Sequence, residues 1–203
     1  MTLYAATSNP GKLAEFAASA NSAGIAVLAL PNLANLPEPL EDAPTFQANA
    51  DLKAVAYSLA APGLMIFADD SGLEAAALNG APGVRSARFA DDLAFHPNSG
   101  SKDERNNRAL LSQLSLHTTR SARFVCALAL ARDGHILLRA EGTVEGQILT
   151  SPRGDAGFGY DPLFLIPALS LTLAELPSEQ KWQLSHRGNA FRFLLAQLAH
   201  TRF

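Results

Sequence analysis

Residues 124–140 have the sequence FVCALALARDGHILLRA, and this stretch decides the fold class of the chain. Two apolar runs of strand length, Phe124–Ala131 and Ile136–Ala140, flank the dipeptide Asp133-Gly134. The dipeptide favours a two-residue hairpin turn, because both of its residues tolerate a positive φ angle. The pattern therefore predicts an antiparallel hairpin in the middle of the chain.

The single cysteine of the chain, Cys126, lies within the first of these runs. One cysteine cannot form an internal disulfide bond. Its apolar neighbours predict a buried structural thiol, and a catalytic thiol is the disfavoured alternative.

On the N-terminal side, the pattern changes to strand, polar loop and helix. Leu3–Ala6 is a short apolar run, the polar turn Thr7–Lys12 follows it, and Ile25–Leu30 is a second apolar run. Between the turn and the second run, apolar residues recur at helical spacing: Leu13, Phe16, Ala17 and Ala20. Together with the central hairpin, this order predicts a mixed α/β architecture.

A second helix and a third strand follow. Thr45 is a plausible N-cap for a helix with the apolar stripe Ala48, Leu52, Val55 and Leu59. Asn49 and Lys53, four residues apart, share another face of that helix. The apolar run Leu64–Ala68 then ends at Asp69-Asp70-Ser71-Gly72. This pattern predicts two acids at the carboxyl end of a strand.

Turn and helix-cap residues in the rest of the sequence predict the remaining elements. Asn79-Gly80 predicts a hairpin turn, and Ser101 with Glu104 forms a capping box for a helix, after an exposed loop at His96–Ser101. The last helix carries a stripe made of Phe191, Leu194, Leu195 and Leu198. A length of 203 residues suits one domain, 1–203, with room for an inserted lobe.

Composition narrows the class of ligand. The net charge of −3 gives no overall attraction to nucleic acid or to an anionic membrane, so we expect neither as a partner. A small anionic substrate remains compatible with locally gathered cations. The N-terminus lacks the basic and apolar regions of a signal peptide, and no run has transmembrane length, which makes the cytoplasm the expected compartment.

Three polar segments carry candidate chemistry. The Thr7–Lys12 turn offers backbone amides and Lys12 at a helix start, which favours an anion, although a plain helix-entry loop is an equal alternative. Asp69 and Asp70 favour metal and base roles, against the alternative that both accept hydrogen bonds from the amides of a tight turn. The acidic group Glu38, Glu41 and Asp42 suits Mg²⁺, or is a solvated loop.

Two further groups of residues near the C-terminus are suited to a nucleotide. Lys181 and Ser185-His186-Arg187-Gly188 supply donors for a phosphate or an oxo group, although the latter run is equally an ordinary helix cap. Phe158 and Tyr160 lie among glycines, where an aromatic ring can stack on a planar base; for either ring alone, core packing is the favoured alternative.

Taken together, six segments resemble the inosine triphosphate pyrophosphatase family in order and spacing, over nearly the whole chain. They are Thr7–Lys12, Thr45–Ala50 with Lys53, Asp69–Leu73, Gly80–Gly83 with Ser86–Arg88, Phe158–Pro162, and Ser185–Gly188. The resemblance implies an elongated mixed α/β sheet with flanking helices and two lobes around a central nucleotide cleft. It also implies a homodimer.

The same resemblance implies hydrolysis of inosine and xanthosine triphosphates, and of their deoxy forms, to the monophosphate and pyrophosphate. By position, Asp70 would ligate Mg²⁺ and accept a proton from the attacking water, with Asp69 in support. The implied substrate-binding residues are Thr7, Ser8, Asn9, Pro10, Gly11, Lys12, Lys53, Ser71, Phe158, Gly159, Tyr160, Asp161, Lys181, His186 and Arg187.

One position departs from the family pattern and keeps alternatives open. The family often has two consecutive acids where this chain has Leu40 and Glu41, so Glu41 is the metal candidate and Glu38 the alternative. A pyrophosphatase for other modified or pyrimidine triphosphates, similar to the Maf-type proteins, is one competing interpretation. A nucleotide-binding sensor without catalysis is the other.

Overall fold

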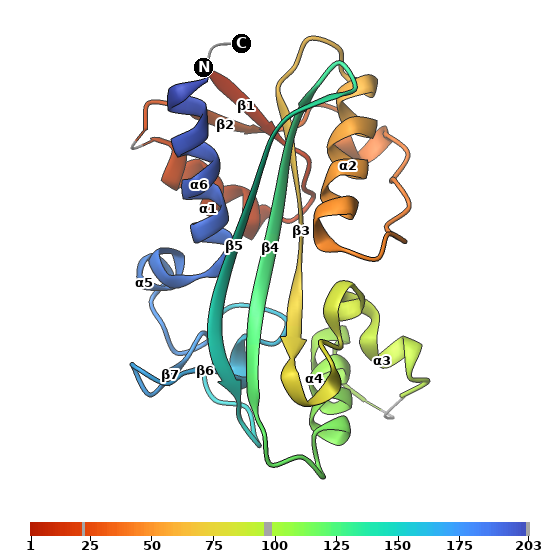
Figure 1. Cartoon of the computed structure of the whole chain (residues 1–203), viewed down its shortest axis with the longest axis vertical. Helices are drawn as coiled ribbons and strands as arrows, with labels where there is room; N and C mark the ends of the chain where they lie inside the picture. The colour runs from red at the N-terminus through yellow and green to blue at the C-terminus, as the bar shows by residue number, and fades with distance from the viewer. Residues whose placement is uncertain (22, 96–98, 202–203) are drawn as a thin grey trace. The chain divides into compact units, whose positions relative to one another are not determined.

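The structure is a computed structural model that describes residues 1–21, 23–95 and 99–201 (Figure 1). The chain divides into two compact units. Unit 1 comprises Met1–Asp70, Cys126–Gly142 and Ser185–Phe203, and unit 2 comprises Ser71–Val125 and Thr143–Leu184. The prediction that residues 1–203 form a single domain stays a prediction.

A seven-stranded sheet has the strand order β2-β1-β3-β4-β5-β6-β7. Its strands are β1 (Thr2–Ala5), β2 (Ala26–Ala29), β3 (Ile66–Ala75), β4 (Ser121–Arg132), β5 (His135–Ile148), β6 (Phe164–Ile166) and β7 (Leu171–Thr172). β1 pairs in parallel with β2 and β3, whereas β6 pairs antiparallel with β5 and β7. The predicted mixed α/β class is confirmed.

Unit 1 packs three long helices: α1 (Pro10–Asn21), α2 (Phe46–Ala60) and α6 (His186–His200). Phe16 of α1, Phe67 of β3 and Phe191 of α6 form an aromatic cluster, with ring centroids 4.9 to 5.5 Å apart. All three side chains are fully buried. Because such rings bury large apolar surfaces, the cluster fixes the two helices that flank β3.

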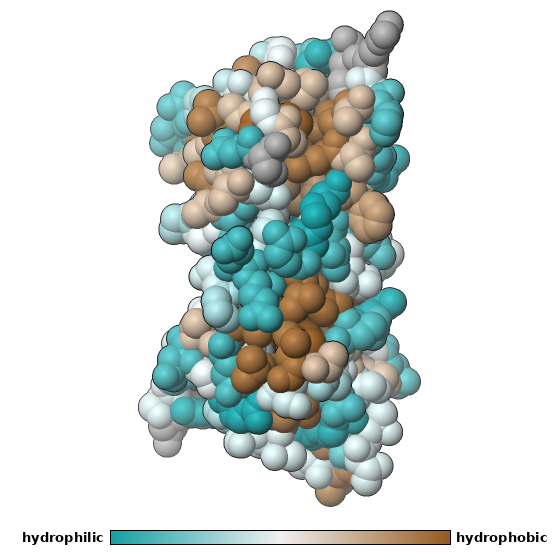
Figure 2. All heavy atoms as spheres, turned by 90° about the vertical axis from the view of Figure 1, so that its left-hand side faces the viewer, coloured by the Kyte–Doolittle hydropathy of each residue, from teal (hydrophilic) through white to brown (hydrophobic). Residues whose placement is uncertain are grey.

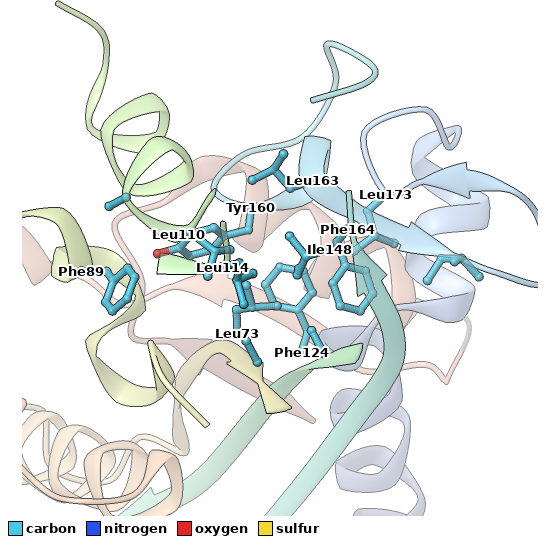
Figure 3. Close-up of a cluster of buried hydrophobic side chains, with 14 of the residues drawn as sticks. Leu73, Phe89, Leu110, Leu114, Phe124, Ile148, Tyr160, Leu163, Phe164 and Leu173 are labelled. Carbon is cyan, nitrogen blue, oxygen red and sulfur yellow. The ribbon is translucent and has the colours of Figure 1, made fainter. Parts of the chain in front are cut away.

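Unit 2 has its own core, shown in Figure 3. Leu73 of β3, Leu110 of α4 (Lys102–Gln113), and Phe124 of β4 belong to it, together with Phe164 of β6. The Phe124 and Phe164 rings lie 4.7 Å apart. The other α-helices among the described residues of this unit are the short α3 (Phe89–Asp92) and α5 (Ser178–Leu184). The capping box of Ser101 and Glu104 is confirmed at the start of α4.

The central hairpin prediction is also confirmed. β4 and β5 are neighbours in the sheet, joined by Asp133 and Gly134 with φ angles of 52° and 80°. Cys126 is a free, fully buried thiol in β4, as predicted. Burial raises its pKa to about 12, so the thiol stays protonated and unreactive at neutral pH.

The predicted apolar stripe of the second helix is wrong. Thr45 caps α2 as expected, with its side chain accepting a hydrogen bond from the Ala48 amide. However, Leu52 and Leu59 are 46% and 61% exposed, whereas α2 buries a face of small and aromatic side chains with two polar ones: Phe46, Asn49, Ala50, Ala54, Tyr57 and Ser58. The predicted stripe rests mainly on leucines. A close contact between the helix and the sheet, however, favours small side chains such as alanine on the buried face.

The prediction that the third strand ends before Asp69 is wrong as well. β3 does not stop at Ala68 but continues through Asp69, Asp70, Ser71 and Gly72 to Ala75. Adjacent carboxylates do not break this strand, because consecutive side chains point to opposite faces of a sheet and each finds its own cationic partner. The alternative of a tight turn whose amides bind both aspartates is thereby excluded.

Two smaller predictions complete the comparison. Asn79 has a left-handed φ of 52° after a short 3-10 helix (Ala76–Leu78), and a bridge joins Glu74 to Pro82, so the chain reverses here without a second regular strand. In the predicted loop His96–Ser101, residues 96–98 lie outside the described residues, and 99–101 are exposed.

The surface mixes polar and apolar side chains. Figure 2 shows one face on which brown apolar patches alternate with teal hydrophilic ones. Within the described residues, no helix has the length and apolarity needed to cross a membrane.

Candidate active site

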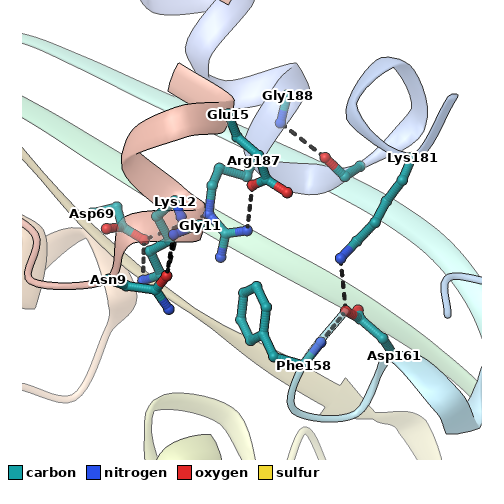
Figure 4. A network of polar contacts seen from close by, with 11 residues as sticks. Asn9, Gly11, Lys12, Glu15, Asp69, Phe158, Asp161, Lys181, Arg187 and Gly188 are labelled. Atoms are coloured by element: carbon teal, nitrogen blue, oxygen red, sulfur yellow. Dashed lines mark hydrogen bonds and ion pairs between the residues drawn. The ribbon is translucent and has the colours of Figure 1, made fainter. Parts of the chain in front are cut away.

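Asp69 lies in a buried cationic environment (Figure 4). Its Oδ2 accepts a hydrogen bond from Lys12 Nζ at 2.8 Å and lies 3.9 Å from Arg187 Nε. Burial alone would raise the pKa of Asp69, but the charges of Lys12, Arg187 and Lys53 outweigh it and hold the pKa well below its usual range. Asp69 is therefore a permanent carboxylate that fixes cations.

Asp70 has different partners, because it points to the other side of β3. Asn49 Nδ2 donates to Asp70 Oδ2 at 2.9 Å, and Lys53 Nζ lies 3.9 Å from Oδ1. Burial raises the pKa of Asp70, and Lys53 and Asn49 oppose this rise only in part. A buried carboxyl group with a raised pKa is suited to accept a proton.

Lys53 connects the Asp70 carboxylate to the acidic loop, which is the segment that contains Glu38, Glu41 and Asp42. Its Nζ lies 3.1 Å from Glu41 Oε2, and both groups belong to unit 1. Burial alone would lower the pKa of Lys53, but the surrounding carboxylates Asp69, Asp70 and Glu41 raise it above its usual value. Lys53 is therefore a firmly charged ammonium group between two carboxylates.

The Thr7–Lys12 turn leads into α1, and the amides of Asn9, Gly11 and Lys12 are engaged within it. Asn9 Oδ1 accepts from the amides of Gly11 and Lys12 at 2.9 and 3.1 Å, and the Asn9 amide donates to Thr7 Oγ1 at 3.2 Å. Asn9 thus acts as the helix cap. Since these amides are satisfied within the turn, the expectation that they bind an anion is not what the geometry favours, and side chains are the better candidates.

The Ser185-His186-Arg187-Gly188 run begins α6 and belongs to the same unit as Asp69. Ser185 Oγ accepts from the Gly188 amide at 3.1 Å, so this serine is the N-cap. His186 and Arg187 are buried in the first turn. Arg187 Nη1 donates to Glu15 Oε2 of α1 at 3.3 Å, so the guanidinium group has a second carboxylate neighbour besides Asp69.

A cavity of about 710 Å³ lies in unit 1, and Lys12, Glu41, Lys53 and Asp69 are among the residues that line it. Four regions line it: the turn after β1 with the start of α1, the segment after β2, the acidic loop with α2, and Asp69 of β3. The lining residues are Ala6, Thr7, Ser8, Asn9, Pro10, Lys12, Leu13, Ala29, Leu30, Asn32, Leu33, Ala34, Leu36, Glu38, Glu41, Lys53, Tyr57 and Asp69. The cavity therefore brings together the Thr7–Lys12 turn, the acidic loop and Lys53.

The charges of this cavity do not by themselves suit a polyphosphate. Its lining carries two lysines, Lys12 and Lys53, against three carboxylates, Glu38, Glu41 and Asp69. A triphosphate entering such a site needs additional positive charge. Among the described residues no group of three or more His, Cys, Asp or Glu side chains could hold a metal ion alone. Mg²⁺, however, commonly uses one or two carboxylates and completes its shell with water and substrate phosphates, so a larger cluster is not required for such an ion.

In unit 2, Phe158 and Lys181 are organised around Asp161. The Asp161 Oδ2 atom accepts from Lys181 Nζ at 2.7 Å and from the Phe158 amide at 2.9 Å. Lys181 Nζ also lies 5.1 Å from the centre of the Phe158 ring, a cation–π contact. Figure 4 labels these three side chains.

The two aromatic rings of this segment are placed differently. Phe158 is 40% exposed, whereas Tyr160 is only 4% exposed within the core of unit 2. The Tyr160 hydroxyl donates to the Ser86 carbonyl at 2.9 Å, and burial raises its pKa well above the usual range. Tyr160 thus packs in the core, and Phe158 is the ring with an open surface. Ser71 is half-buried in β3, directly after Asp70.

The sequence interpretation missed several residues of the site. The sequence predicts that Asn49 shares a helix face with Lys53, but not that Asn49 binds Asp70. Its position one helical turn before Lys53 was the only indication of a role in the site. Glu15, the partner of Arg187, is 172 residues away in sequence, and no local pattern reveals it. Asn32 and Tyr57, which line the cavity, had no signal of their own.

Comparison with known proteins shows which family the chain belongs to. A model of the Ham1 family matches residues 3–197. A curated protein of Acidobacterium capsulatum, named dITP/XTP pyrophosphatase, is 51% identical over 199 residues, covering 98% of each chain. A second one, from an Exiguobacterium species and with the same name, is 47% identical and covers 98% of this chain and 97% of its own.

Solved structures agree as well. The Staphylococcus aureus Ham1 protein matches with a TM-score of 0.84 and 38% identity over all of both chains. A HAM1 protein from Coxiella burnetii matches with a TM-score of 0.85 and 36% identity, over 99% of this chain and all of its own. The expected family resemblance is thereby confirmed: the chain belongs to the Ham1 family.

Proposed function

We propose that this protein hydrolyses noncanonical purine nucleoside triphosphates, namely those of inosine, deoxyinosine and xanthosine, to the nucleoside monophosphate and pyrophosphate. The curated relatives named dITP/XTP pyrophosphatase, at up to 51% identity over 98% of the chain, support this activity. Removal of such nucleotides keeps the nucleotide pool clean.

One observation carries the chemical proposal: two neighbouring aspartates of β3 have opposite pKa shifts. The pKa of Asp69 is lowered by its cationic neighbours, whereas burial raises the pKa of Asp70. Pairs of carboxylates whose environments separate their pKa values commonly divide the tasks of electrostatic support and proton transfer. Asp70 is accordingly the proton acceptor, and Asp69 is the support.

The reaction needs a water molecule, a base and a neutralised phosphate group. Water attacks phosphorus, the α,β-anhydride bond breaks, pyrophosphate leaves, and Asp70 takes the proton that the water loses. Asn49, which donates to Asp70 Oδ2, keeps the carboxylate in a fixed orientation. The leaving pyrophosphate carries the electron pair of the broken bond.

Cationic side chains of unit 1 are assigned to the phosphates. Lys12 and Lys53 both line the cavity, together with the hydroxyl groups of Thr7 and Ser8. Their positive charges stabilise the negative charge that develops on phosphate oxygens during attack. Asn9, Pro10 and Gly11 shape the turn that presents these groups.

Mg²⁺ is the proposed cofactor, and the negative balance of charged side chains in the cavity supports the need for a cation. Asp70 and Glu41 would hold the ion, with Glu38 as the alternative second carboxylate, since Glu38 lines the cavity together with Glu41. When bound, the ion supplies charge neutralisation for the phosphate oxygens.

The remaining candidates are assigned to the nucleoside. Phe158 has the exposed ring that stacks on a base, and Lys181, His186 and Arg187 supply donors for its oxo group. Gly159, Asp161 and Tyr160 support the loop, and Ser71 contacts the substrate. The proposed cytoplasmic location and homodimer stay predictions of the sequence.

A panel of triphosphates tests the activity. Pyrophosphate release is measured with inosine, deoxyinosine, xanthosine, adenosine, guanosine, cytidine and uridine triphosphates, with Mg²⁺ and with excess chelator. We expect the first three to be turned over, the adenosine and guanosine triphosphates to be much poorer substrates, and turnover to be lost with chelator. Preference for pyrimidine triphosphates would support the Maf-like alternative, and binding without turnover would support the sensor.

A further inference from the structure

The loop that carries Phe158 is held from a second side by α4, a helix to which the proposed function assigns no role. Asp103 and Asn107 of α4 lie four residues apart and so share one face of the helix. The Gly159 amide donates to Asp103 Oδ2 at 2.7 Å, and Asn107 Nδ2 donates to the Gly159 carbonyl at 3.0 Å. Both backbone polar groups of one loop residue are therefore bound by one helix.

The loop has a conformation that depends on such contacts. Gly157 and Gly159 both have left-handed φ angles, of 79° and 62°. A Cβ atom on Gly157 would lie 2.2 Å from Asp161 Oδ2, so the backbone approaches the carboxylate closely. Because glycine backbones sample many conformations, a glycine-rich loop needs external hydrogen bonds to keep one of them.

The orientation of the Asn107 amide supports the importance of this contact. Its Oδ1 is buried and has no hydrogen-bond partner among the residues that the structure describes. Reversing the amide would place this oxygen against the Gly159 carbonyl and lose the bond. The bond to Gly159 therefore determines the orientation of the side chain, at the expense of an unsatisfied acceptor.

The helix itself is a firm base for these two side chains. Ser101 and Glu104 close its capping box, and Leu110 and Ala109 are fully buried. Asn106 accepts from the Ala90 amide at 2.9 Å and donates to the Ala87 carbonyl at 3.3 Å, which ties α4 to its neighbouring segment.

We propose that Asp103 and Asn107 are positioning residues that set the direction of the Phe158 ring toward the base; the proposal rests on the assignment of Phe158 to the nucleoside. Phe158 immediately precedes Gly159, so fixing the Gly159 backbone limits where the ring points. Loss of the two bonds lets the loop sample other conformations and weakens binding of the nucleoside. The proton acceptor Asp70 belongs to the other unit and is untouched.

Near-isosteric variants separate positioning from simple loss of structure. Asp103→Ala removes the acceptor, whereas Asp103→Asn keeps an oxygen in the same place. Asn107→Asp keeps the size but replaces the donor with an acceptor that repels the Gly159 carbonyl. Gln113→Ala, at an exposed position of the same helix, is the matched control.

The measurements are KM and kcat for inosine triphosphate, melting temperature, and hydrogen exchange of the Gly159 amide. We expect Asp103→Ala and Asn107→Asp to raise KM about fivefold to tenfold, the effect of one hydrogen bond, with kcat within about twofold of wild type. Asp103→Asn and Gln113→Ala should keep the wild-type KM. Gly159 exchange should accelerate in Asp103→Ala and stay slow in Gln113→Ala.

The outcomes distinguish this inference from the proposed activity. A wild-type protein without turnover refutes the activity, while an unchanged Gly159 exchange in Asp103→Ala refutes the anchoring. An active wild type whose Asp103→Ala and Asn107→Asp variants keep the normal KM overturns the positioning role. The positioning role is also overturned if Asp103→Ala and Asn107→Asp lower kcat at constant KM, or if Asp103→Asn does not keep the wild-type KM.

Discussion

Asp69 and Asp70 are neighbours in the chain, yet they interact with different helices. Asp69 binds Lys12 of α1 and approaches Arg187 of α6, whereas Asp70 binds Asn49 of α2. The separation follows from the period of two in a β-strand, which sends adjacent side chains to opposite faces. A single strand thus supplies two carboxylates with different proton affinities, without placing their charges side by side.

This division makes a prediction for Asp70→Asn. The amide keeps the shape of the side chain but removes the charge and most of the basicity, so turnover should fall by about 10² or more if Asp70 accepts the proton. Turnover of inosine triphosphate is measured beside far-ultraviolet circular dichroism, which confirms folding. Asp92→Asn, a surface carboxylate paired with Arg85, is the control and should keep its activity. Near wild-type turnover of Asp70→Asn would remove Asp70 from this role.

At the scale of elements, α2 and β3 show what the sequence pattern reveals and what it conceals. The start of α2 at Thr45 was predictable, because capping is a local interaction. Its buried face was not, since alanines and a buried Asn49 replaced the larger side chains on which the prediction relied. The predicted third strand ended too early, before Asp69. The cations that stabilise its carboxylates, such as Arg187, come from distant parts of the chain and give no local signal.

The corrected face of α2 predicts an unequal response to substitution. Leu52→Gln replaces a side chain that is 46% exposed and should change the free energy of unfolding by about 0.5 kcal/mol or less. Ala54→Leu adds three carbons at a fully buried position and should cost about 1–3 kcal/mol through overpacking. Urea denaturation of both variants measures the difference. A larger loss for Leu52→Gln would restore the stripe expected from the sequence.

For the whole molecule, the sequence predicted the fold class and family better than the arrangement of the site. Six segments in order identified the family, because the order and spacing of motifs can be read along the linear chain. The contacts of Arg187 with Glu15 and of Asp103 with Gly159 join residues 172 and 56 positions apart, and no local spacing encodes them. Tyr160 shows the same limit, since its burial depends on a core assembled from distant elements.

Cys126 contributes to the response of the whole fold to alkaline pH. Burial raises its pKa from 9.0 to about 12, so the native state keeps the proton while the unfolded chain releases it. The stability that this thiol contributes is complete below about pH 9 and is lost as the pH rises toward 12, at about 1.4 kcal/mol per pH unit. Other groups titrate in the same range. A Cys126→Ala variant retains these groups, so their effect cancels in the difference between the two proteins.

The free energy of unfolding of the wild type, minus that of Cys126→Ala, should therefore be constant up to about pH 8 and fall by about 1 kcal/mol by about pH 10. Urea denaturation at several pH values gives this difference directly. In the native protein the thiol should also resist a disulfide reagent at about pH 8, and should react once urea unfolds the chain. A difference that stays flat up to about pH 10, or rapid labelling of the native protein, would mean that Cys126 is accessible to solvent and that the β4 core opens more readily than its packing indicates.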